Sequence, residues 1–270
     1  MSKDSNEILK DIAAELTTAR REEIDERKLD FMHRHGLLKG AMRPIERNEK
    51  NAAYLEKFRR KREESEAEEL PQFTEREFKL MVVEYVNKEM EKRAPGQGFN
   101  WTERYQKLYR NLMYYFAGDD RCAWPVGKGL LFLGPTGVGK TMALKVFQNL
   151  IVNEMPRHPK RFKMTTCQNV FEWFKASQHD GIQEYLRGHW CFDDLGQEEP
   201  VYMHYGNKIN VMEQVLFERD LQRQKEYTNT IITTNLNTAE MEERYGTRVL
   251  DRLSEMCTFV QIDGESQRRN

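Results

Sequence analysis

Hydrophobic and polar positions divide the chain into a charged first part and an apolar-patterned remainder. Up to about residue 70 the sequence is dominated by Glu, Lys and Arg. Ile8, Ile12 and Leu16 recur at four-residue spacing, which predicts one short amphipathic helix. Elsewhere in this part, too little apolar surface is present to offset the entropy of ordering. We therefore interpret residues 1–70 as a charged arm, helical or partly disordered, that binds a partner.

A helical module is predicted over residues 71–120. Apolar residues recur at helical spacing over 73–91 and again over 101–116, and a Pro- and Gly-containing loop separates the two segments. The second segment is rich in aromatic residues, namely Tyr105, Tyr109, Tyr114, Tyr115 and Phe116. Such rings can stack on single-stranded bases, but at helical spacing they more often form a core. We expect them to pack inside the module.

Short apolar runs alternate with amphipathic segments over residues 121–270. The runs predict strands at 129–133, 161–165, 190–193, 230–234 and 259–262. The segments between them predict helices at 141–153, 169–177, 207–223 and 238–254. Strands alternating with helices indicate an α/β domain, a parallel five-stranded sheet with helices on both faces.

Composition narrows the possible classes of protein. The net charge is −1 and 32% of residues are charged, so the chain is not a uniformly basic nucleic-acid coat. A local cluster, Lys160, Arg161 and Lys163, would either contact DNA or form a solvated strand edge. No run reaches the about 18 apolar residues of a membrane span. Four scattered cysteines, without zinc-site spacing, indicate a reducing environment, and we expect a cytoplasmic protein.

A phosphate-binding motif follows the first predicted strand. The pattern G-x-x-x-x-G-K-[ST] is complete in Gly134, Pro135, Thr136, Gly137, Val138, Gly139, Lys140 and Thr141. Glycines let successive backbone N–H groups turn toward phosphate oxygens, and the following helix adds its positive N-terminal end. We expect Lys140 to reach the β- and γ-phosphates of ATP and the Thr141 hydroxyl to ligate Mg²⁺.

Polar residues at two later strand ends complete a candidate catalytic set. Asp193 and Asp194 end the strand at 190–193, where Asp193 would hold Mg²⁺ and Asp194 would orient or deprotonate the attacking water. Acids facing solvent at a strand end are the alternative. Asn235 follows the strand at 230–234 and would hold the water or touch the γ-phosphate, although asparagine there is also a common turn former.

These motifs, together with Gly246–Arg252, resemble the AAA+ ATPases of the DnaC/DnaI-type helicase loaders and the related IstB-type transposition ATPases. The resemblance covers residues 125–270 and implies Walker A at 134–141, Walker B at Asp193 and Asp194, and sensor 1 at Asn235. Asp194 replaces the commoner Glu, which implies slow hydrolysis. Too little sequence follows Asn235 for the helical lid of most AAA+ proteins, so we expect none.

The resemblance also assigns arginines to a subunit interface. It implies an arginine finger at Arg252, supported by Arg248, that reaches a neighbouring subunit's nucleotide, and a sensor 2-like role for Arg268. A guanidinium supplied across an interface couples hydrolysis to assembly. The alternative is that Arg248 and Arg252 pair with Asp251 or Glu255 on one exposed helix.

The resemblance implies a slow ATP hydrolase that self-associates in ATP and contacts single- or double-stranded DNA. The leading interpretation is a loader whose N-terminal helices grip a hexameric replicative helicase. The alternative is an IstB-type helper that recruits a transposase. Two other classes of protein are compatible with a phosphate-binding loop. A small-molecule kinase would need no interface arginine. A nucleotide-gated adaptor, which binds ATP but barely hydrolyses it, would keep its biological activity after Asp194→Ala.

Overall fold

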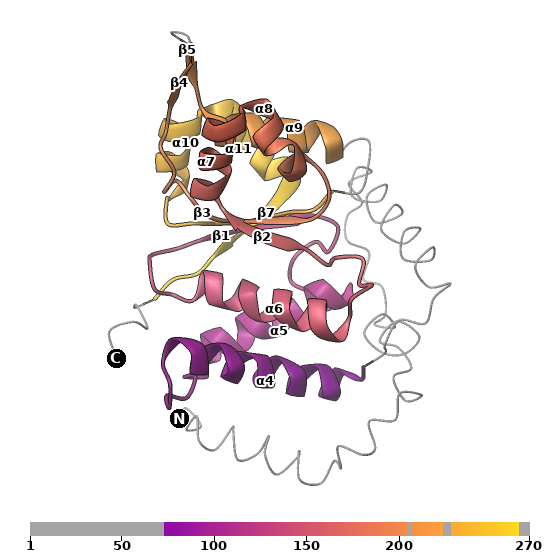
Figure 1. Cartoon of the computed structure of the whole chain (residues 1–270). Helices are drawn as coiled ribbons and strands as arrows, with labels where there is room; N and C mark the ends of the chain where they lie inside the picture. The colour runs from indigo at the N-terminus through magenta and orange to yellow at the C-terminus, as the bar shows by residue number, and fades with distance from the viewer. Residues whose placement is uncertain (1–72, 205–206, 224–227, 265–270) are drawn as a thin grey trace. The chain divides into compact units, whose positions relative to one another are not determined.

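The computed structural model of the chain describes residues 73–204, 207–223 and 228–264. Two predictions from the sequence, the arm at 1–70 and the role of Arg268, concern residues outside those described. Among the helices that are described, none is long and apolar enough to cross a membrane. Contacts group the described residues into two compact units, 73–126 with 142–161, and 127–141 with 162–264. Figure 1 labels most of the helices and strands of both units.

The first unit contains three long helices, which are α4 (Glu75–Arg93), α5 (Glu103–Ala117) and most of α6 (Lys140–Glu154). A capping box starts α4: the Glu77 N–H donates to Thr74 Oγ1 at 3.2 Å, and the Thr74 N–H donates to the Glu77 carboxylate at 2.7 Å. Gly118, with φ at 68°, ends α5. The two predicted helices of the module are confirmed.

Aromatic side chains form the core of the first unit. The Phe147 ring stacks on Tyr109 and Phe116, with centroids 6.1 and 5.2 Å apart. Tyr105 and Tyr115 are also buried, so the prediction that these rings form a core is confirmed.

Lys160 belongs to this core and not to a basic surface. Its side chain is buried, and Nζ donates to the Tyr115 carbonyl at 2.6 Å and lies 3.5 Å from the Tyr115 ring centroid. Burial lowers the pKa of Lys160 well below its usual value. Arg161 and Lys163 remain exposed. Of the three basic residues considered for DNA contact, only Arg161 and Lys163 are therefore available at the surface.

The second unit is built on a parallel sheet in the order β2-β3-β6-β1-β7. Its strands are β1 (Gly129–Leu133), β2 (Lys163–Thr166), β3 (Trp190–Leu195), β6 (Thr230–Thr234) and β7 (Cys257–Gln261). Every neighbouring pair is parallel. The central strands β1 and β6 are buried along their whole length, as expected of a parallel sheet. The predicted α/β fold with a parallel five-stranded sheet, preceded by helices, is confirmed.

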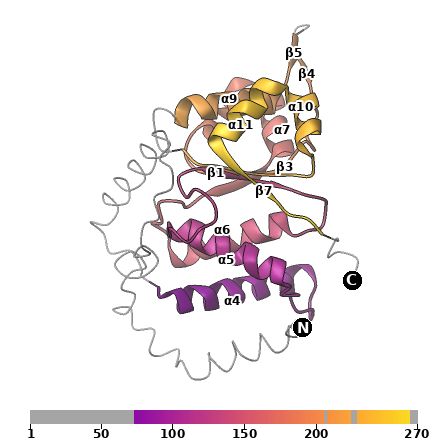
Figure 2. The same ribbon diagram turned by 180° about the vertical axis from the view of Figure 1, so that it is seen from behind.

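The helices of the second unit lie together on one face of this sheet in both views (Figures 1 and 2). They are α7 (Cys167–Ser177), α8 (His179–Ile182), α9 (Val211–Arg223), α10 (Thr238–Tyr245) and α11 (Thr247–Met256), with a 3-10 turn at Gln183–Leu186. Their apolar faces and the sheet share one buried cluster that includes Phe171, Phe192 and Leu253. This packing holds the carboxyl ends of the strands in fixed positions.

Two helices differ from the sequence expectation. The helix predicted at 207–223 begins only at Val211, because residues 207–209 form β5 (Asn207–Ile209), paired antiparallel with β4 (Tyr202–His204). Asn210 then caps α9 by accepting the Glu213 N–H at 3.1 Å. The helix predicted at 238–254 is divided into α10 and α11 by Gly246, whose φ of 82° is left-handed.

Candidate functional site

The predicted site residues follow three adjacent strands of the sheet. The glycine-rich loop follows β1, Asp193 and Asp194 lie near the end of β3, and Asn235 follows β6. In the strand order, β6 lies between β3 and β1. Since the strands are parallel, their carboxyl ends share one edge, and ligands of open α/β sheets bind at that edge.

The loop between β1 and α6 has the backbone of a phosphate cradle. Gly134, Gly137 and Gly139 have φ values of 151°, 91° and 87°. These conformations suit glycine and turn successive N–H groups inward. Helix α6 begins at Lys140, so the loop leads directly into the positive end of a 15-residue helix.

Gly134 is the loop position most sensitive to a side chain. A Cβ there would lie 2.1 Å from the Ile262 carbonyl oxygen, in addition to the strained φ. We expect Gly134→Ala to lower the free energy of unfolding by more than about 3 kcal/mol, because backbone atoms would have to move. Gly188→Ala is the matched control, since Gly188 is also left-handed but has nothing within 4 Å. Urea unfolding of both variants checks this, and equal losses would contradict it.

Lys140 and Asn235, far apart in sequence, are brought together at this edge. The Lys140 ammonium is buried and donates to the carbonyls of Gly134 at 2.6 Å and Pro135 at 3.0 Å. It also donates to Asn235 Oδ1 at 2.7 Å. A buried cation therefore lies against the loop, and the residue expected at sensor 1 holds it from the neighbouring strand.

Thr141 and Asp193 are also brought together. The Thr141 hydroxyl donates to Asp193 Oδ1 at 2.8 Å, and the Asp193 side chain is buried. The same carboxylate oxygen accepts from the Thr233 hydroxyl at 2.6 Å. Two hydroxyls from different elements thus hold one buried carboxylate at the edge of the phosphate loop.

Thr233 is a site residue that the sequence reasoning did not identify. Besides donating to Asp193, its hydroxyl oxygen accepts the backbone N–H of Asp194 at 2.9 Å. It therefore fixes both acids of the pair. Side chains alternate along a strand, so a strand that continued to Asn235 would place Thr233 on the same face. That alternation, counted back from Asn235, would have found it.

Asp194 adopts a left-handed backbone, with φ at 58°. This conformation is uncommon for a residue other than glycine, and such strain concentrates at functional sites. Asp194 is half-buried, next to the buried Asp193. The chain therefore turns at Asp194, directly after the buried carboxylate of Asp193.

The two arginines that the sequence predicts at a subunit interface have unlike surroundings. Arg252 forms an ion pair with Asp220 on α9, and its guanidinium lies 4.2 Å from the Phe217 ring centroid. Arg248 is exposed and lies 5.5 Å from the same ring. Asp220 is buried and is also held by Arg223, at 2.9 Å. Arg252 is therefore paired across helices, and not with Asp251 or Glu255 on its own helix.

The residues at this edge fit a nucleoside triphosphate and a magnesium ion. A glycine cradle and a buried lysine match phosphate oxygens, and a threonine hydroxyl beside a carboxylate is the oxygen donor set that Mg²⁺ prefers.

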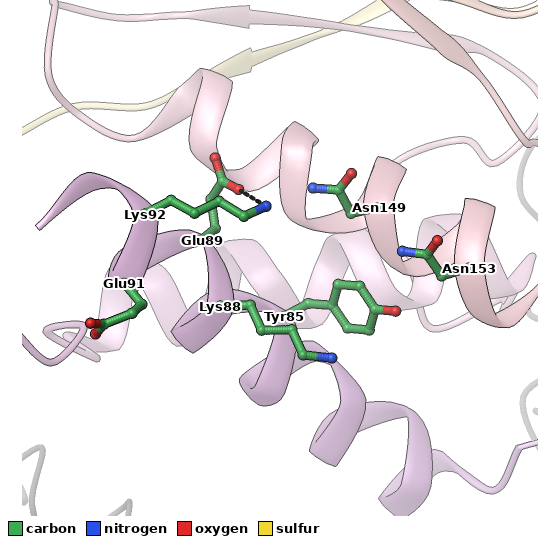
Figure 3. A pocket seen from close by; sticks show the side chains of 7 residues that line it. All are labelled: Tyr85, Lys88, Glu89, Glu91, Lys92, Asn149 and Asn153. Atoms are coloured by element: carbon green, nitrogen blue, oxygen red, sulfur yellow. Dashed lines mark hydrogen bonds and ion pairs between the residues drawn. The ribbon is translucent and has the colours of Figure 1, made fainter. Parts of the chain in front are cut away.

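A second candidate, a pocket between α4 and α6, has a different chemistry. Figure 3 shows its lining, Tyr85, Lys88, Glu89, Glu91, Lys92, Asn149 and Asn153, around a volume of about 420 Å³. Two lysines are balanced there by two glutamates. Moreover, Lys88 pairs with Glu84 at 2.8 Å and Lys92 with Glu89 at 3.5 Å. This pocket lacks the excess positive charge that a triphosphate requires.

Comparison with known proteins gives one family. Residues 124–270 match the IstB-like ATP binding proteins. No curated protein matches the chain.

Similar solved structures include a candidate primosome component from Streptococcus pyogenes serotype M3, at 17% identity and a TM-score of 0.45, covering 62% of this chain and 84% of that one. The DnaC helicase loader has 23% identity and a TM-score of 0.39, covering 50% and 78%. PCH-2 of C. elegans has 16% identity and a TM-score of 0.33, covering 70% and 43%.

Proposed function

Because the chain belongs to the family of IstB-like ATP binding proteins, we propose that it is a slow ATP hydrolase whose activity depends on assembly. The observation that carries this is the contact of 2.8 Å between the Thr141 hydroxyl and Asp193 Oδ1. This contact joins the end of the phosphate loop to the strand that carries the two aspartates, as metal-assisted phosphoryl transfer requires. The buried Lys140, held by Asn235 at 2.7 Å, supports the same conclusion.

Each residue then has a role in hydrolysis. Bound ATP with Mg²⁺ supplies the anhydride bond and the charge that neutralises the leaving phosphate. The loop N–H groups and Lys140 bind and orient phosphate oxygens, and Thr141 and Asp193 would hold the metal. Asp194 would take the proton of the attacking water while Asn235 orients that water. Thr233 keeps both acids in place through its contacts of 2.6 and 2.9 Å.

The site would be completed by an arginine from a neighbouring copy. Arg252 is the leading finger and Arg248 the supporting one. To reach a neighbour's phosphates, Arg252 must exchange its ion pair with Asp220 for a new one. Arg248 is exposed and needs no such exchange. Turnover per chain should therefore rise with protein concentration in ATP, and a concentration-independent rate would count against assembly.

Single substitutions of the two arginines should separate structure from catalysis. Arg252→Ala leaves the buried Asp220 with Arg223 alone, so we expect a loss of about 1 kcal/mol in the free energy of unfolding. Arg248→Ala should change that free energy by less than about 0.5 kcal/mol. In the assembled state, whichever of the two substitutions removes the arginine finger should lower ATP turnover by about 10³-fold. Chemical unfolding and turnover at high protein concentration check both effects.

The finer proposal is that the chain loads a replicative DNA helicase. It is supported by the motif set at 134–141, 191–196, 233–236 and 246–252 and by the charged region at residues 1–70. Light scattering of the full chain mixed with the hexameric helicase of its host, with and without ATP, tests this. We expect a stable complex, and the absence of one in both conditions would contradict a loader.

The second candidate is a transposition helper that binds DNA and recruits a transposase. The match of residues 124–270 to the IstB-like family favours it. It predicts no helicase complex but ATP-dependent oligomers on DNA, which the same light-scattering experiment detects when a DNA duplex replaces the helicase.

A further inference from the structure

We propose that Glu198 is a positioning residue that couples the loop carrying Asp194 to the α10–α11 corner carrying the interface arginines. This rests on the proposed function, because it assigns a regulatory connection to the same ATP site. Glu198 follows β3 and is almost fully buried, at 3% exposure. A buried carboxylate is costly unless donors surround it, so its partners indicate its role.

One side of Glu198 holds the loop after β3. Oε2 accepts the backbone N–H of Gly196 at 2.8 Å, and Gly196 lies two residues after Asp194. The chain turns sharply here, with φ at 58° for Asp194 and 99° for Gly196. A Cβ at Gly196 would lie 2.6 Å from Leu236, next to Asn235. The carboxylate thus fixes a strained turn that determines where the Asp194 side chain points.

The other side of Glu198 holds the end of α10. Oε1 accepts the Tyr245 hydroxyl, and Arg244 contacts both the Glu198 carbonyl and, at 3.6 Å, Oε1. Tyr245 is buried, and burial together with the nearby Glu198 charge raises its pKa, so the phenol stays a proton donor. Tyr245 and Arg244 are the last residues of α10.

The end of α10 leads directly into the helix of the interface arginines. Gly246, at φ 82°, is the only residue between α10 and α11, and Arg248 follows in the first turn of α11. Displacement of this corner by a neighbouring copy would move Tyr245 and Arg244, and through Glu198 the Gly196 amide. Contact of the arginines with a neighbouring copy would therefore change the orientation of Asp194 through the hydrogen bonds of Glu198 and the short backbone segments on either side of it.

Glu198→Gln and Tyr245→Phe in the full chain test this coupling. Glutamine keeps the volume of Glu198, but an NH2 group replaces one of the two carboxylate oxygens, so a hydrogen-bond donor then faces a donor. We expect about a 10-fold loss of kcat at high protein concentration, with the Kd for ATP changed by less than about 3-fold, because the phosphate loop is untouched. Tyr245→Phe should act in the same direction, and the double variant should be no worse than Glu198→Gln alone.

The stimulation of turnover by protein concentration is the readout that a merely structural role would not move. Both variants should lose it. Glu199→Gln, next to Glu198 but exposed and 4.0 Å from Lys175, is the matched control and should behave as wild type.

Wild-type stimulation in folded Glu198→Gln and Tyr245→Phe would overturn the proposal, as would a parallel loss of ATP affinity and kcat. If Glu198→Gln does not fold, Tyr245→Phe alone decides. A wild-type chain without turnover at any concentration would instead overturn the proposed function, and this coupling with it.

Discussion

Replacing Lys140 with alanine is expected to lower the affinity for ATP by about 100-fold or more, because charge-assisted hydrogen bonds to two phosphates are lost. The ammonium is buried against the loop carbonyls of Gly134 and Pro135 and is tied to Asn235. These contacts position the ammonium at the loop before phosphate binds. No other lysine lies in the loop. Calorimetric titration with ATP measures the effect.

Lys145→Ala is the matched control for this substitution. Lys145 lies further along the same helix, outside the phosphate loop, and is half-buried. It should bind ATP as wild type does, and thermal melts should show that both variants fold. Wild-type affinity in folded Lys140→Ala would contradict the assignment of the loop as the phosphate site.

Asp193→Asn is expected to lower Mg²⁺-dependent turnover by about 10³-fold while ATP binding without metal is retained. An asparagine oxygen can still accept the hydroxyls of Thr141 and Thr233, so the local hydrogen bonds survive. What is lost is the negative charge beside the metal. Steady-state turnover against Mg²⁺ concentration, together with ATP affinity in a chelator, separates the two effects.

An exposed aspartate provides the comparison for that variant. Asp180→Asn, on α8, removes a charge from the same unit and should leave turnover unchanged. Turnover of Asp193→Asn close to that of Asp180→Asn would mean that the metal is held elsewhere.

The parts of the fold that were predictable are those that short-range patterns determine. The strands at 129–133 and 230–234 are observed with the predicted bounds, since each is a short, fully buried run, rich in leucine in the first case and in β-branched isoleucine and threonine in the second. The meeting of Lys140 with Asn235 was also foreseeable in outline, because parallel strands present their ends at one edge. The role of each residue at that edge stays a prediction.

The parts that escaped prediction depend on contacts between distant segments or on very short elements. The antiparallel pair of β4 and β5 consists of three-residue strands, too short for a periodic pattern to be recognised. The pairing of Arg252 with Asp220 joins two residues that are 32 positions apart and lie on different helices, so spacing along one helix gives no sign of it. The grouping of residues 142–161 with 73–126 is likewise a property of packing. The division of the chain at 70 and 120 stays a prediction.

The central claim is that two copies of the chain build one active site, and mixing two inactive variants tests it most directly. Asp193→Asn keeps its arginines but lacks a working site of its own, whereas the double variant Arg248→Ala and Arg252→Ala keeps its site but lacks the arginines. Equimolar mixing in ATP and Mg²⁺ should restore turnover to a substantial fraction of wild type, because each interface of the productive kind combines an intact site with a neighbour's arginine. Turnover of the mixture no higher than the sum of the two separate chains, with both variants folded and co-assembled, would contradict a shared site.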